Sequence, residues 1–399
     1  MRILHTVAYY YPFQDRGGPV VKVRSLVQAL RQRGHQLTVL TPNLGLDARH
    51  SFGIQARPCK WGWQSDENGV RAVYLSSWFR HRSLTLNPGV LGFCRESLAE
   101  FDVVHFYGLY DLLGPSVGKC CRRLQLPYVI EPMGMFRPID RSFRKKRLWQ
   151  RTFGRSFWRG AAKIIATSEL EAQELAELGV PAEKVVLRYN GVEASLSDRL
   201  PSRSEFRYRH SISLSEPVLV LLSRLIPRKG ADLLIQAFAS ACPAEGRLVI
   251  AGPEGQPGYR SHLEKYAREL GVGSRVLFTG PLYDAEKKSV LAAADVFVLP
   301  SRYENFANVV AEAISCGVPV IISRFCGIRS LVDGRAGLVV DLEPAALSSS
   351  IRSLLDDPVL YARLKAGCRV VTEELSWNQL AASMERYYES VVGKTFPGA

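Results

Sequence analysis

The sequence predicts an α/β protein with two doubly wound parallel sheets, one in each half of the chain. Short runs rich in leucine and β-branched residues alternate with longer amphipathic runs, which is the pattern of parallel strands joined by crossover helices. The chain has 399 residues, 47% of them hydrophobic, which is too long for one ordinary core and sufficient for two. A Ser-, Arg-, Pro- and Asp-rich stretch at 192–216 interrupts the alternation, as an interdomain linker would.

The first half begins with an apolar strand at 2–8, and a glycine-containing loop leads from it to an amphipathic helix at 19–33. A second helix is predicted at 169–178. The remaining strands of this half are expected at 36–41, 69–75, 102–106, 128–131, 163–167 and 185–188. Residues 1–195 are therefore expected to form one domain.

The alternation restarts after the linker, where a short basic helix opens the second expected domain, residues 196–376. Its strands are predicted at 218–223, 247–251, 276–279, 296–299 and 318–322, and its helices at 231–241, 259–270, 285–293 and 309–316. A last amphipathic helix is expected at 378–392. Doubly wound sheets bind ligands at the carboxyl ends of their strands, so we expect two such sheets to face each other across a cleft that holds the chemistry.

Composition and charge restrict the class of protein. With 52 Lys and Arg against 38 Asp and Glu, the net charge of +14 predicts attraction to polyanions such as nucleoside diphosphates, anionic lipid headgroups or nucleic acid. No apolar run reaches the roughly 18 residues that a membrane-spanning helix needs, and the N-terminus lacks the features of a signal peptide, so a cytoplasmic protein is expected. The eight cysteines show no CxxC pair and are expected to be free thiols, with disulfides or metal ligands as the alternative. The seven histidines show no ligand spacing, and no metal site is predicted.

The strongest motif is SRYENFANVVAEAISCGVPV, which begins at Ser301. It follows a predicted strand, so Glu304 is expected on the loop at the carboxyl end of that strand and Glu312 in the next helix. The start of that helix, near Asn308, offers unpaired backbone N–H groups and a positive dipole end, which together favour a diphosphate. The two oxygens of an ionised Glu312 suit both hydroxyls of a ribose.

The second motif is SRLIPRKG, which follows the predicted strand at 218–223. Arg224 and Lys229 are placed to hold the oxygens of a diphosphate, and fixed cations there would stabilise the negative charge that a departing diphosphate gathers. The alternative is that these basic residues only flank the start of a helix. A third loop, QDRGGPV, carries Gly17 and Gly18 before the first helix, where the backbone can approach an oxyanion closely; a plain tight turn is the alternative.

These two motifs, together with the turns AGPEG at 251–255 and TGPLYD at 279–284 and the DRGGP loop, resemble the retaining GT-B glycosyltransferases of family 4 (glycosyl transferases group 1). The resemblance covers nearly the whole chain. It implies two Rossmann-like domains that bind the donor in the second and the acceptor mainly in the first, with residues 377–399 returning to the first domain. It further implies a nucleoside-diphosphate sugar as co-substrate, a saccharide or lipid-linked acceptor in envelope or exopolysaccharide synthesis, and catalysis without a cofactor or bound metal.

The resemblance also assigns roles to residues. Glu304, Arg224 and Lys229 are the expected catalytic residues: Glu304 contacts the donor sugar, and the two cations contact the diphosphate. Glu312 contacts the ribose, the Leu282 backbone lies near the base, and the glycine loop closes on donor and acceptor. The donor-binding residues are thus Gly17, Gly18, Arg224, Lys229, Leu282, Glu304, Phe306, Ala307, Asn308, Val309 and Glu312.

Two departures from the family pattern affect the acceptor and donor sides. Where many members have a Pro-His-Gly turn, this chain has Met133 before Gly134, and methionine cannot relay a proton. The family's Gly-Gly-Ile-Pro-Glu turn reads CGIRS at 326–330, which suggests a specialised donor-side loop. His105, at the end of a predicted strand, matches a frequent family histidine and is expected on the acceptor side together with Met133 and Gly134; a packed structural histidine is the alternative.

The segment Arg137–Arg159 interleaves nine Arg and Lys residues with five aromatic ones. Such an amphipathic helix suits an anionic membrane surface, which would make the protein peripheral on the inner face of the cell membrane; the alternative is a helix that packs its aromatic residues on the sheet. Two further readings of the whole chain are a GT-B phosphorylase or epimerase, and a basic nucleic-acid-binding protein. The last leaves both glutamates of the strongest motif unexplained, so we expect no nucleic-acid partner.

Overall fold

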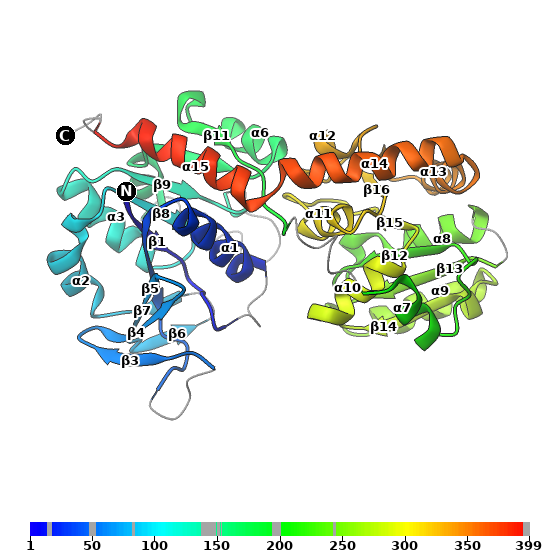
Figure 1. The fold of residues 1–399 in the computed structure, drawn as a ribbon, viewed down its shortest axis with the longest axis horizontal. Coiled ribbons are helices and arrows are strands. Elements are labelled where there is room, and N and C mark those ends of the chain that lie inside the picture. Colours follow the sequence, from blue (N-terminus) through cyan, green and yellow to red (C-terminus); the bar gives the residue numbers. More distant parts are fainter. Residues whose placement is uncertain are drawn as a thin grey trace. The chain divides into compact units, whose positions relative to one another are not determined.

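The computed structural model describes residues 1–13, 18–47, 53–81, 84–136, 149, 152, 154–193, 201–241 and 245–393. The chain divides into two compact units (Figure 1). The first domain comprises Met1–Asn190 and Trp377–Ala399, and the second domain comprises Gly191–Ser376. The division after Asn190 lies a few residues before the boundary expected at 195.

The first domain contains a nine-stranded sheet in the order β11-β10-β9-β8-β1-β2-β5-β4-β3. The strands from β11 to β5 are parallel, whereas β4 and β3 continue the sheet antiparallel. The bounds are β1 Arg2–Thr6, β2 Gln36–Pro42, β3 Ala56–Cys59, β4 Gly62–Glu67, β5 Val70–Leu75, β8 Val103–Tyr107, β9 Tyr128–Glu131, β10 Lys163–Ala166 and β11 Val185–Leu187. Successive strands run outward in both directions from the central pair β1 and β8, so the loops that follow these two strands lie at the topological switch point.

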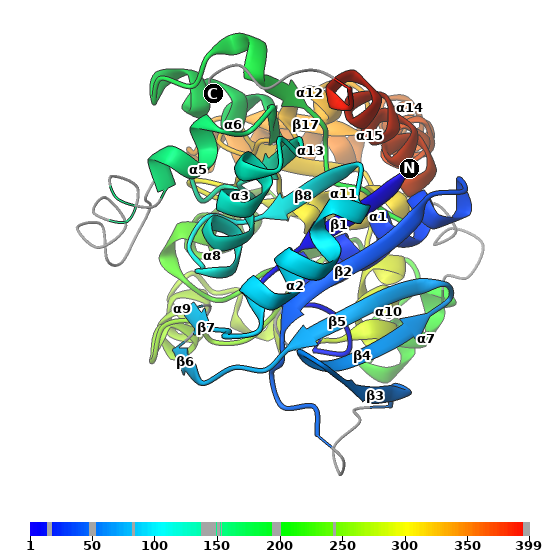
Figure 2. The same cartoon turned by 90° about the vertical axis from the view of Figure 1, so that its left-hand side faces the viewer.

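Helices cover both faces of this sheet. Helices α1 (Gly18–Gln32) and α15 (Trp377–Val391) share one apolar core with one face of the strands, and α2 (Val90–Ser97) and α3 (Leu113–Arg123) share a second core with the other face. Figure 2 shows α2 and α3 in front of the strands. Two further helices, α5 (Arg155–Arg159) and α6 (Glu169–Glu177), precede β10 and β11. A separate hairpin is formed by β6 (Phe79–His81) and β7 (Leu84–Leu86).

The second domain contains a six-stranded parallel sheet in the order β14-β13-β12-β15-β16-β17. Its strands are β12 Val218–Leu222, β13 Arg247–Ala251, β14 Val276–Gly280, β15 Val296–Leu299, β16 Val320–Ser323 and β17 Gly337–Val340. Its helices are α7 Arg203–Arg209, α8 Ala231–Ala241, α9 Tyr259–Glu269, α10 Asp284–Ala293, α11 Asn308–Ser315, α12 Arg329–Val332, α13 Pro344–Asp356 and α14 Pro358–Glu374. The strand order reverses between β12 and β15. The prediction of two doubly wound parallel sheets is thus confirmed.

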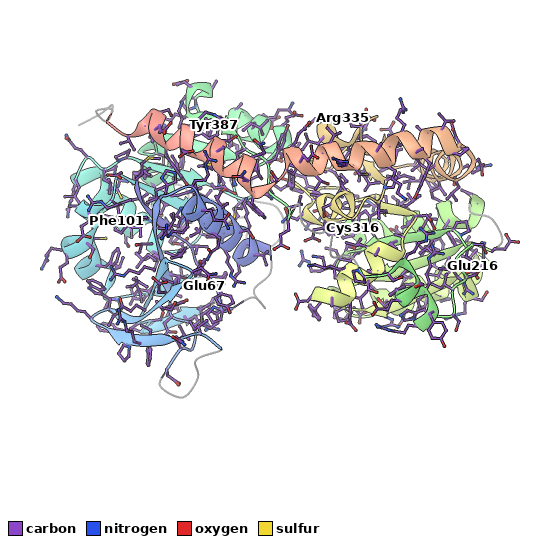
Figure 3. All side chains as sticks on the ribbon, viewed as in Figure 1. Glu67, Phe101, Glu216, Cys316, Arg335 and Tyr387 are labelled. Atoms are coloured by element: carbon purple, nitrogen blue, oxygen red, sulfur yellow. The ribbon has the colours of Figure 1, made fainter. Side chains whose placement is uncertain are left out.

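Helix α15 follows the second domain in the chain and packs into the core of the first. Ala381, Met384 and Tyr388 are buried there beside α1. The Tyr388 hydroxyl lies 2.7 Å from Nδ1 of His105 on β8. Tyr387, labelled in Figure 3, donates a hydrogen bond of 3.1 Å to the carbonyl of Leu187 at the end of β11. The first domain is therefore completed by residues from both ends of the chain.

A buried charged cluster lies under α15. The Glu131 carboxylate at the end of β9 accepts hydrogen bonds from Lys22 on α1 and from Arg188 just after β11. Glu131 and Arg188 have no exposed side-chain surface, and Lys22 is only 6% exposed. Nε2 of His105 lies 3.6 Å from the same carboxylate. We refer to these four residues as the Glu131 cluster.

The stability of the first domain is expected to depend on the ionisation of Asp111, a buried carboxyl at the start of α3. Its Oδ1 accepts a 2.6 Å hydrogen bond from the N–H of Gly114. Burial raises the pKa of Asp111 to about 6, while the backbone hydrogen bonds oppose this shift. Because the pKa in the folded state lies above that in the unfolded state, the stability contributed by the neutral carboxyl is present at acid pH and is lost as the pH rises through about 6.

Asp111→Asn keeps the acceptor and cannot ionise. We expect this variant to gain on the order of 2 kcal/mol of unfolding free energy over the wild type at about pH 8 and little at about pH 4. Denaturant unfolding at the two pH values measures the difference. Asp356→Asn, at the exposed end of α13, is the control and should change the unfolding free energy by less than about 0.5 kcal/mol. A pH-independent effect of Asp111→Asn would contradict the buried, neutral carboxyl.

The seven described cysteines are free thiols, and Cys242 lies outside the described residues. Within the described ranges, no helix combines the length and the apolar character needed to cross a bilayer.

Candidate functional site

The site predicted in the second domain lies at the point where its strand order reverses, between β12 and β15. The loop after β12 contains Arg224 and Lys229, and the loop after β15 contains Glu304. The two loops are tied together because the N–H of Arg302 donates a 2.8 Å hydrogen bond and the hydroxyl of Ser301 a 3.1 Å hydrogen bond to the carbonyl of Arg228. Ligands of doubly wound sheets bind at this position.

Gly230 is required for this contact between the loops. It has φ 72°, and a Cβ atom at this residue would lie 2.1 Å from the carbonyl oxygen of Pro300. No larger residue fits without moving the backbone of the second loop. The RKG part of the motif therefore holds Lys229 against the loop that carries Glu304.

Lys229 and Glu304 form an ion pair, with 13% and 15% of their side chains exposed. The two residues are 75 positions apart in the chain. The backbone of Glu304 is held on both sides: its N–H donates to the carbonyl of Phe325, and its carbonyl accepts from the N–H of Gly327, each at 3.0 Å. The CGIRS segment noted in the sequence thus positions Glu304.

Cys326 is buried beneath Glu304. Burial first, and then the nearby Glu304 carboxylate, raises the pKa of the Cys326 thiol to about 12. The thiol is therefore protonated at neutral pH and is a packing residue rather than a nucleophile, since the thiolate is the reactive form.

The start of α11 presents a site for an anion. Ala307, the N-cap residue, adopts the left-handed conformation with φ 75° and ψ 64°, which is uncommon for a residue other than glycine and costs on the order of 1 kcal/mol. An alanine side chain cannot accept hydrogen bonds from the first-turn N–H groups, as serine or aspartate would at this position. Phe306 is buried beside Ala307, whereas Asn308 is exposed and Val309 is half-buried. Backbone N–H groups and the positive helix end therefore suit a phosphate.

Glu312 lies one turn into α11 and forms an ion pair of 2.5 Å with Lys287 on α10. Both side chains are about one-third exposed, at 29% and 31%. Leu282, half-buried, precedes α10. The sequence pattern did not identify Lys287, because only the packing of α10 beside α11 brings it to Glu312.

Arg224 projects from the first loop with an exposed side chain. Its backbone is held by the AGPEG turn: the N–H of Leu225 donates to the carbonyl of Pro253 at 2.9 Å. Gly252 packs so closely on this loop that a Cβ atom there would lie 1.9 Å from the carbonyl oxygen of Ser223. In the part of the chain that the structure describes, the Arg224 guanidinium makes no hydrogen bond or ion pair. An exposed guanidinium can bind an external anion.

In the first domain, Gly18 is the first residue of α1 and is exposed, while Gly17 lies outside the described residues. Met133 and Gly134 both adopt left-handed conformations, with φ 55° and 75°. The N–H of Gly134 donates a 2.5 Å hydrogen bond to Oε1 of Glu171. The predicted acceptor-side turn is therefore a fixed structure.

Glu171 was not identified from the sequence, although it belongs to a recognisable pattern. Ser168 and Glu171 have the spacing of a capping box at the start of α6, and the Ser168 hydroxyl accepts the N–H of Glu171 at 3.0 Å. The carboxylate accepts from the N–H and the hydroxyl of Thr167 at 2.8 and 2.7 Å, besides Gly134. It links the start of α6 to the Met133–Gly134 turn.

His105 requires a correction. Its side chain has no exposed surface, and it belongs to the Glu131 cluster within the core. Burial, followed by the charges of His5, Arg188 and Lys22, lowers the pKa of His105 well below its ordinary value, so the ring is neutral. A ring without exposed surface does not contact an acceptor sugar in this structure. The packed structural histidine is the better description.

The basic segment Arg137–Arg159 lies largely outside the described residues. The indole N–H of Trp149 donates to the carbonyl of Leu109 at 2.9 Å. Phe157 on α5 is buried, with its ring centroid 5.0 Å from that of Phe106 on β8. These two aromatic residues contact the body of the domain, as the packed-helix alternative expects.

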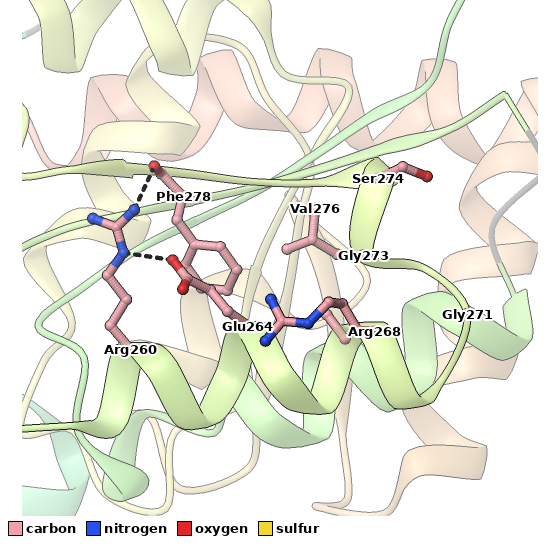
Figure 4. A pocket seen from close by; sticks show the side chains of 9 residues that line it. Arg260, Glu264, Arg268, Gly271, Gly273, Ser274, Val276 and Phe278 are labelled. Atoms are coloured by element: carbon pink, nitrogen blue, oxygen red, sulfur yellow. Dashed lines mark hydrogen bonds and ion pairs between the residues drawn. The ribbon is translucent and has the colours of Figure 1, made fainter.

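A separate pocket of about 500 Å³ lies between α9 and β14 (Figure 4). Arg260 lines it and forms a 2.8 Å ion pair with Glu264, and Arg268 lines it further along α9. The pocket shares no residue with the predicted donor site. Elsewhere among the described residues, no group of three or more His, Cys, Asp or Glu side chains lies close enough to hold a metal ion.

Comparison with known proteins identifies relatives for both halves of the chain. Residues 202–370 match the model of the family "Glycosyl transferases group 1", and residues 17–191 match the "Glycosyl transferase 4-like domain". The chain is 33% identical over 397 residues to a D-inositol 3-phosphate glycosyltransferase of Xylanimonas cellulosilytica, covering 94% of this chain and 92% of that protein.

Solved structures with the same fold include the Anabaena protein Alr3699/HepE in complex with UDP, with a TM-score of 0.75 and 20% identity over 98% of this chain and all of that chain. The sucrose-phosphate synthase of Thermosynechococcus elongatus has a TM-score of 0.71 at 20% identity, over 98% of this chain and 99% of that one.

Proposed function

Because the chain belongs to the GT-B glycosyltransferases of family 4, we propose that it transfers a sugar from a nucleoside-diphosphate sugar to an acceptor hydroxyl, with retention of anomeric configuration. The observation that supports this proposal best is the Lys229–Glu304 pair at the switch point between β12 and β15. An ammonium and a carboxylate held side by side support this proposal, because a phosphate binds a cation and sugar hydroxyls donate to a carboxylate. The donor complexes named for HepE, with UDP and UDP-glucose, are consistent with such a donor.

In the proposed complex the diphosphate occupies the start of α11. Arg224 forks onto its oxygens, and Lys229 supplies a point charge. Glu312, oriented by Lys287, accepts the ribose hydroxyls, and the backbone of Leu282 lies beside the base. The two cations hold the leaving group more tightly as its negative charge grows, which favours the transition state over the bound substrate.

In the proposed reaction the proton of the acceptor hydroxyl passes to the donor and not to the Met133 side chain. Methionine at position 133 cannot accept a proton, so we assign none of this chemistry to that side chain. The acceptor oxygen attacks the anomeric carbon on the face from which the diphosphate leaves, and the departing phosphate oxygen takes the acceptor proton. The Met133–Gly134 turn, fixed by Glu171, forms part of the acceptor surface. This proposal involves neither a cofactor nor a bound metal.

We further propose a saccharide or lipid-linked acceptor in the synthesis of envelope polysaccharide, with the enzyme acting on the inner face of the cell membrane. The name of the Xylanimonas relative adds D-inositol 3-phosphate to the acceptors that need testing. The basic surface of the chain suits phosphorylated acceptors in general.

A screen of nucleotide sugars tests the function. We expect one UDP-, GDP- or ADP-sugar to raise the melting temperature, because a ligand that binds only the folded state stabilises it. With a suitable acceptor, the same donor should release the nucleoside diphosphate and give a product of unchanged anomeric configuration, as read by NMR. Dependence on inorganic phosphate would indicate a phosphorylase instead. Salt-sensitive oligonucleotide binding without any turnover would indicate a nucleic-acid-binding protein.

The proposed role of the two basic residues in binding phosphate leads to a separate prediction. The double variant Arg224→Ala and Lys229→Ala should bind the nucleoside diphosphate roughly 100-fold more weakly, since two charge-assisted hydrogen bonds are lost. Binding of the uncharged nucleoside should change less than about threefold, because these residues are assigned to the phosphates. Isothermal titration measures both. Lys265→Ala, an exposed residue of α9, is the control, and equal losses for diphosphate and nucleoside would contradict the assignment.

A further inference from the structure

The pocket between α9 and β14 lies at one edge of the six-stranded sheet, because β14 is the outermost strand and pairs with β13. Its volume of about 500 Å³ falls within the range of roughly 300–1,000 Å³ that small-molecule sites occupy. Side chains alternate along a strand, so β14 presents Val276 and Phe278 to the pocket from one face. The proposed transfer reaction does not use this pocket.

The loop that joins α9 to β14 closes one end of the pocket (Figure 4). The Arg247 guanidinium, from the neighbouring strand β13, donates a 3.0 Å hydrogen bond to the carbonyl of Ser274 in this loop. A Cβ atom at Gly273 would lie 2.8 Å from Cγ of Arg268, so the glycine leaves room for the arginine side chain to lie against the loop. The pocket is therefore formed before any ligand binds.

Three charged residues of α9 line the pocket at intervals of about one turn: Arg260, Glu264 and Arg268. Nε of Arg260 lies 2.8 Å from Oε1 of Glu264, and Cζ of Arg260 lies 5.9 Å from the centre of the Phe278 ring. Within the described residues, neither the Arg268 guanidinium nor Oε2 of Glu264 makes a hydrogen bond or ion pair. The described lining thus carries two guanidinium groups against one carboxylate, and the excess positive charge favours an anion.

The half-buried ring of Phe278 adds an apolar surface beside these charges. In the view of Figure 4 it lies between the two guanidinium groups. The C–H face of a sugar ring is apolar and packs on an aromatic ring, while the sugar hydroxyls donate to the free oxygen of Glu264. A carboxylate or phosphate on the same sugar pairs with Arg268 through two N–H groups. A neutral sugar leaves the charge of Arg268 unpaired.

We propose that the pocket between α9 and β14 binds a saccharide that bears a carboxylate or a phosphate, with the sugar ring on Phe278 and the anionic group on Arg268. The site shares no residue with the predicted donor site. Binding there makes and breaks no covalent bond, so the proposal stands apart from the proposed function.

Isothermal titration of the full chain with glucuronate, glucose 6-phosphate, glucose and inorganic phosphate tests the proposal. We expect one of the two anionic sugars to bind at least roughly tenfold more tightly than glucose, since it adds a charge-assisted hydrogen bond. The same sugar should bind more tightly than inorganic phosphate, because phosphate has no ring to pack on Phe278. Comparison of glucuronate with glucose 6-phosphate identifies the preferred anion.

Substitutions assign the ligand to the pocket. Arg268→Gln should weaken binding of the anionic sugar roughly tenfold or more, and Phe278→Leu, which keeps an apolar side chain without the flat ring, roughly threefold or more. Lys265→Gln is the matched control, since this residue is on the same helix, is 71% exposed and does not line the pocket. It should bind like the wild type. The melting temperatures of the Arg268 and Lys265 variants should equal that of the wild type, because both side chains are exposed.

The proposal is overturned if neither anionic sugar binds, if glucose or inorganic phosphate binds as tightly, or if Arg268→Gln keeps wild-type affinity. The double variant Arg224→Ala and Lys229→Ala should retain the affinity for the anionic sugar. Loss of binding in that variant would place the sugar in the donor site and would also overturn the proposal. If no nucleotide sugar binds while the anionic sugar still does, the proposed function fails and this site stands.

Discussion

Replacing Glu304 with glutamine is expected to lower kcat by at least roughly 100-fold while leaving the second domain folded. Glutamine keeps the size of the side chain and an acceptor for Lys229, and the backbone contacts with Phe325 and Gly327 do not depend on the side chain. What is lost is the negative charge beside the donor sugar. As the bond to the diphosphate breaks, positive charge grows on the anomeric carbon, and a carboxylate stabilises it whereas an amide does not.

Steady-state kinetics with the donor found in the screen measure the loss, and the shift in melting temperature with the nucleoside diphosphate shows whether the fold and the phosphate site are intact. Glu373→Gln is the control, since that side chain is 66% exposed on α14 and pairs with Arg369 of its own helix. Wild-type turnover in the Glu304 variant would remove this residue from the catalytic site. Loss of turnover together with loss of the thermal shift would point to a binding defect rather than to catalysis.

Replacing Glu131 with glutamine is expected to cost the first domain about 3–5 kcal/mol of unfolding free energy, because it removes the carboxylate that two buried cations bind. Lys22 and Arg188 both bind this carboxylate, and neither can reach water by a small movement. Burial and the charge of Arg188 already lower the pKa of Lys22 well below its ordinary value. Without Glu131, the pKa of Lys22 is expected to fall further.

Thermal unfolding of the full chain measures this effect, and amide hydrogen exchange assigns it to the first domain. Glu96→Gln is the matched control, since Glu96 pairs with Lys60 at the surface of the same domain and should cost less than about 1 kcal/mol. Adding Lys22→Met and Arg188→Met to the Glu131 variant should restore part of the stability, because apolar side chains of similar volume need no counter-charge. A Glu131 variant as stable as wild type would show that the cluster contributes nothing.

The strands that the sequence predicts best are those buried on both faces of a parallel sheet. Such strands read as unbroken apolar runs, and β9, β13 and β15 have the predicted bounds. The missed strands β3, β4, β6 and β7 are partly exposed and carry polar residues, so no run marks them. Strand β17 (Gly337–Val340) was also missed, although its four residues form a short apolar run. One signal was available: Asn68-Gly69, both with positive φ, forms the tight turn between β4 and β5 that this residue pair favours.

The residues of the candidate site also fall into those that the sequence could predict and those that it could not. Lys229 and Glu304 could be proposed because each follows a buried strand, and strand ends of one sheet meet at one edge. Lys287 and Glu171 could not be placed, because their partners depend on how helices pack on the sheet. The burial of His105 was hidden for the same reason: helix α15, from the far end of the chain, covers that strand.

The position of α15 also has a consequence for biosynthesis. A ribosome makes the chain from its N-terminus, so the residues up to Asn190 emerge long before Tyr388 and Met384, which fill their core. The second domain, whose residues are contiguous from Gly191 to Ser376, has no such delay and is able to fold as it emerges. The first domain stays incomplete, with the apolar side of α1 uncovered, until α15 has been synthesised. A nascent chain of this enzyme is therefore expected to need a chaperone on its first half for longer than on its second.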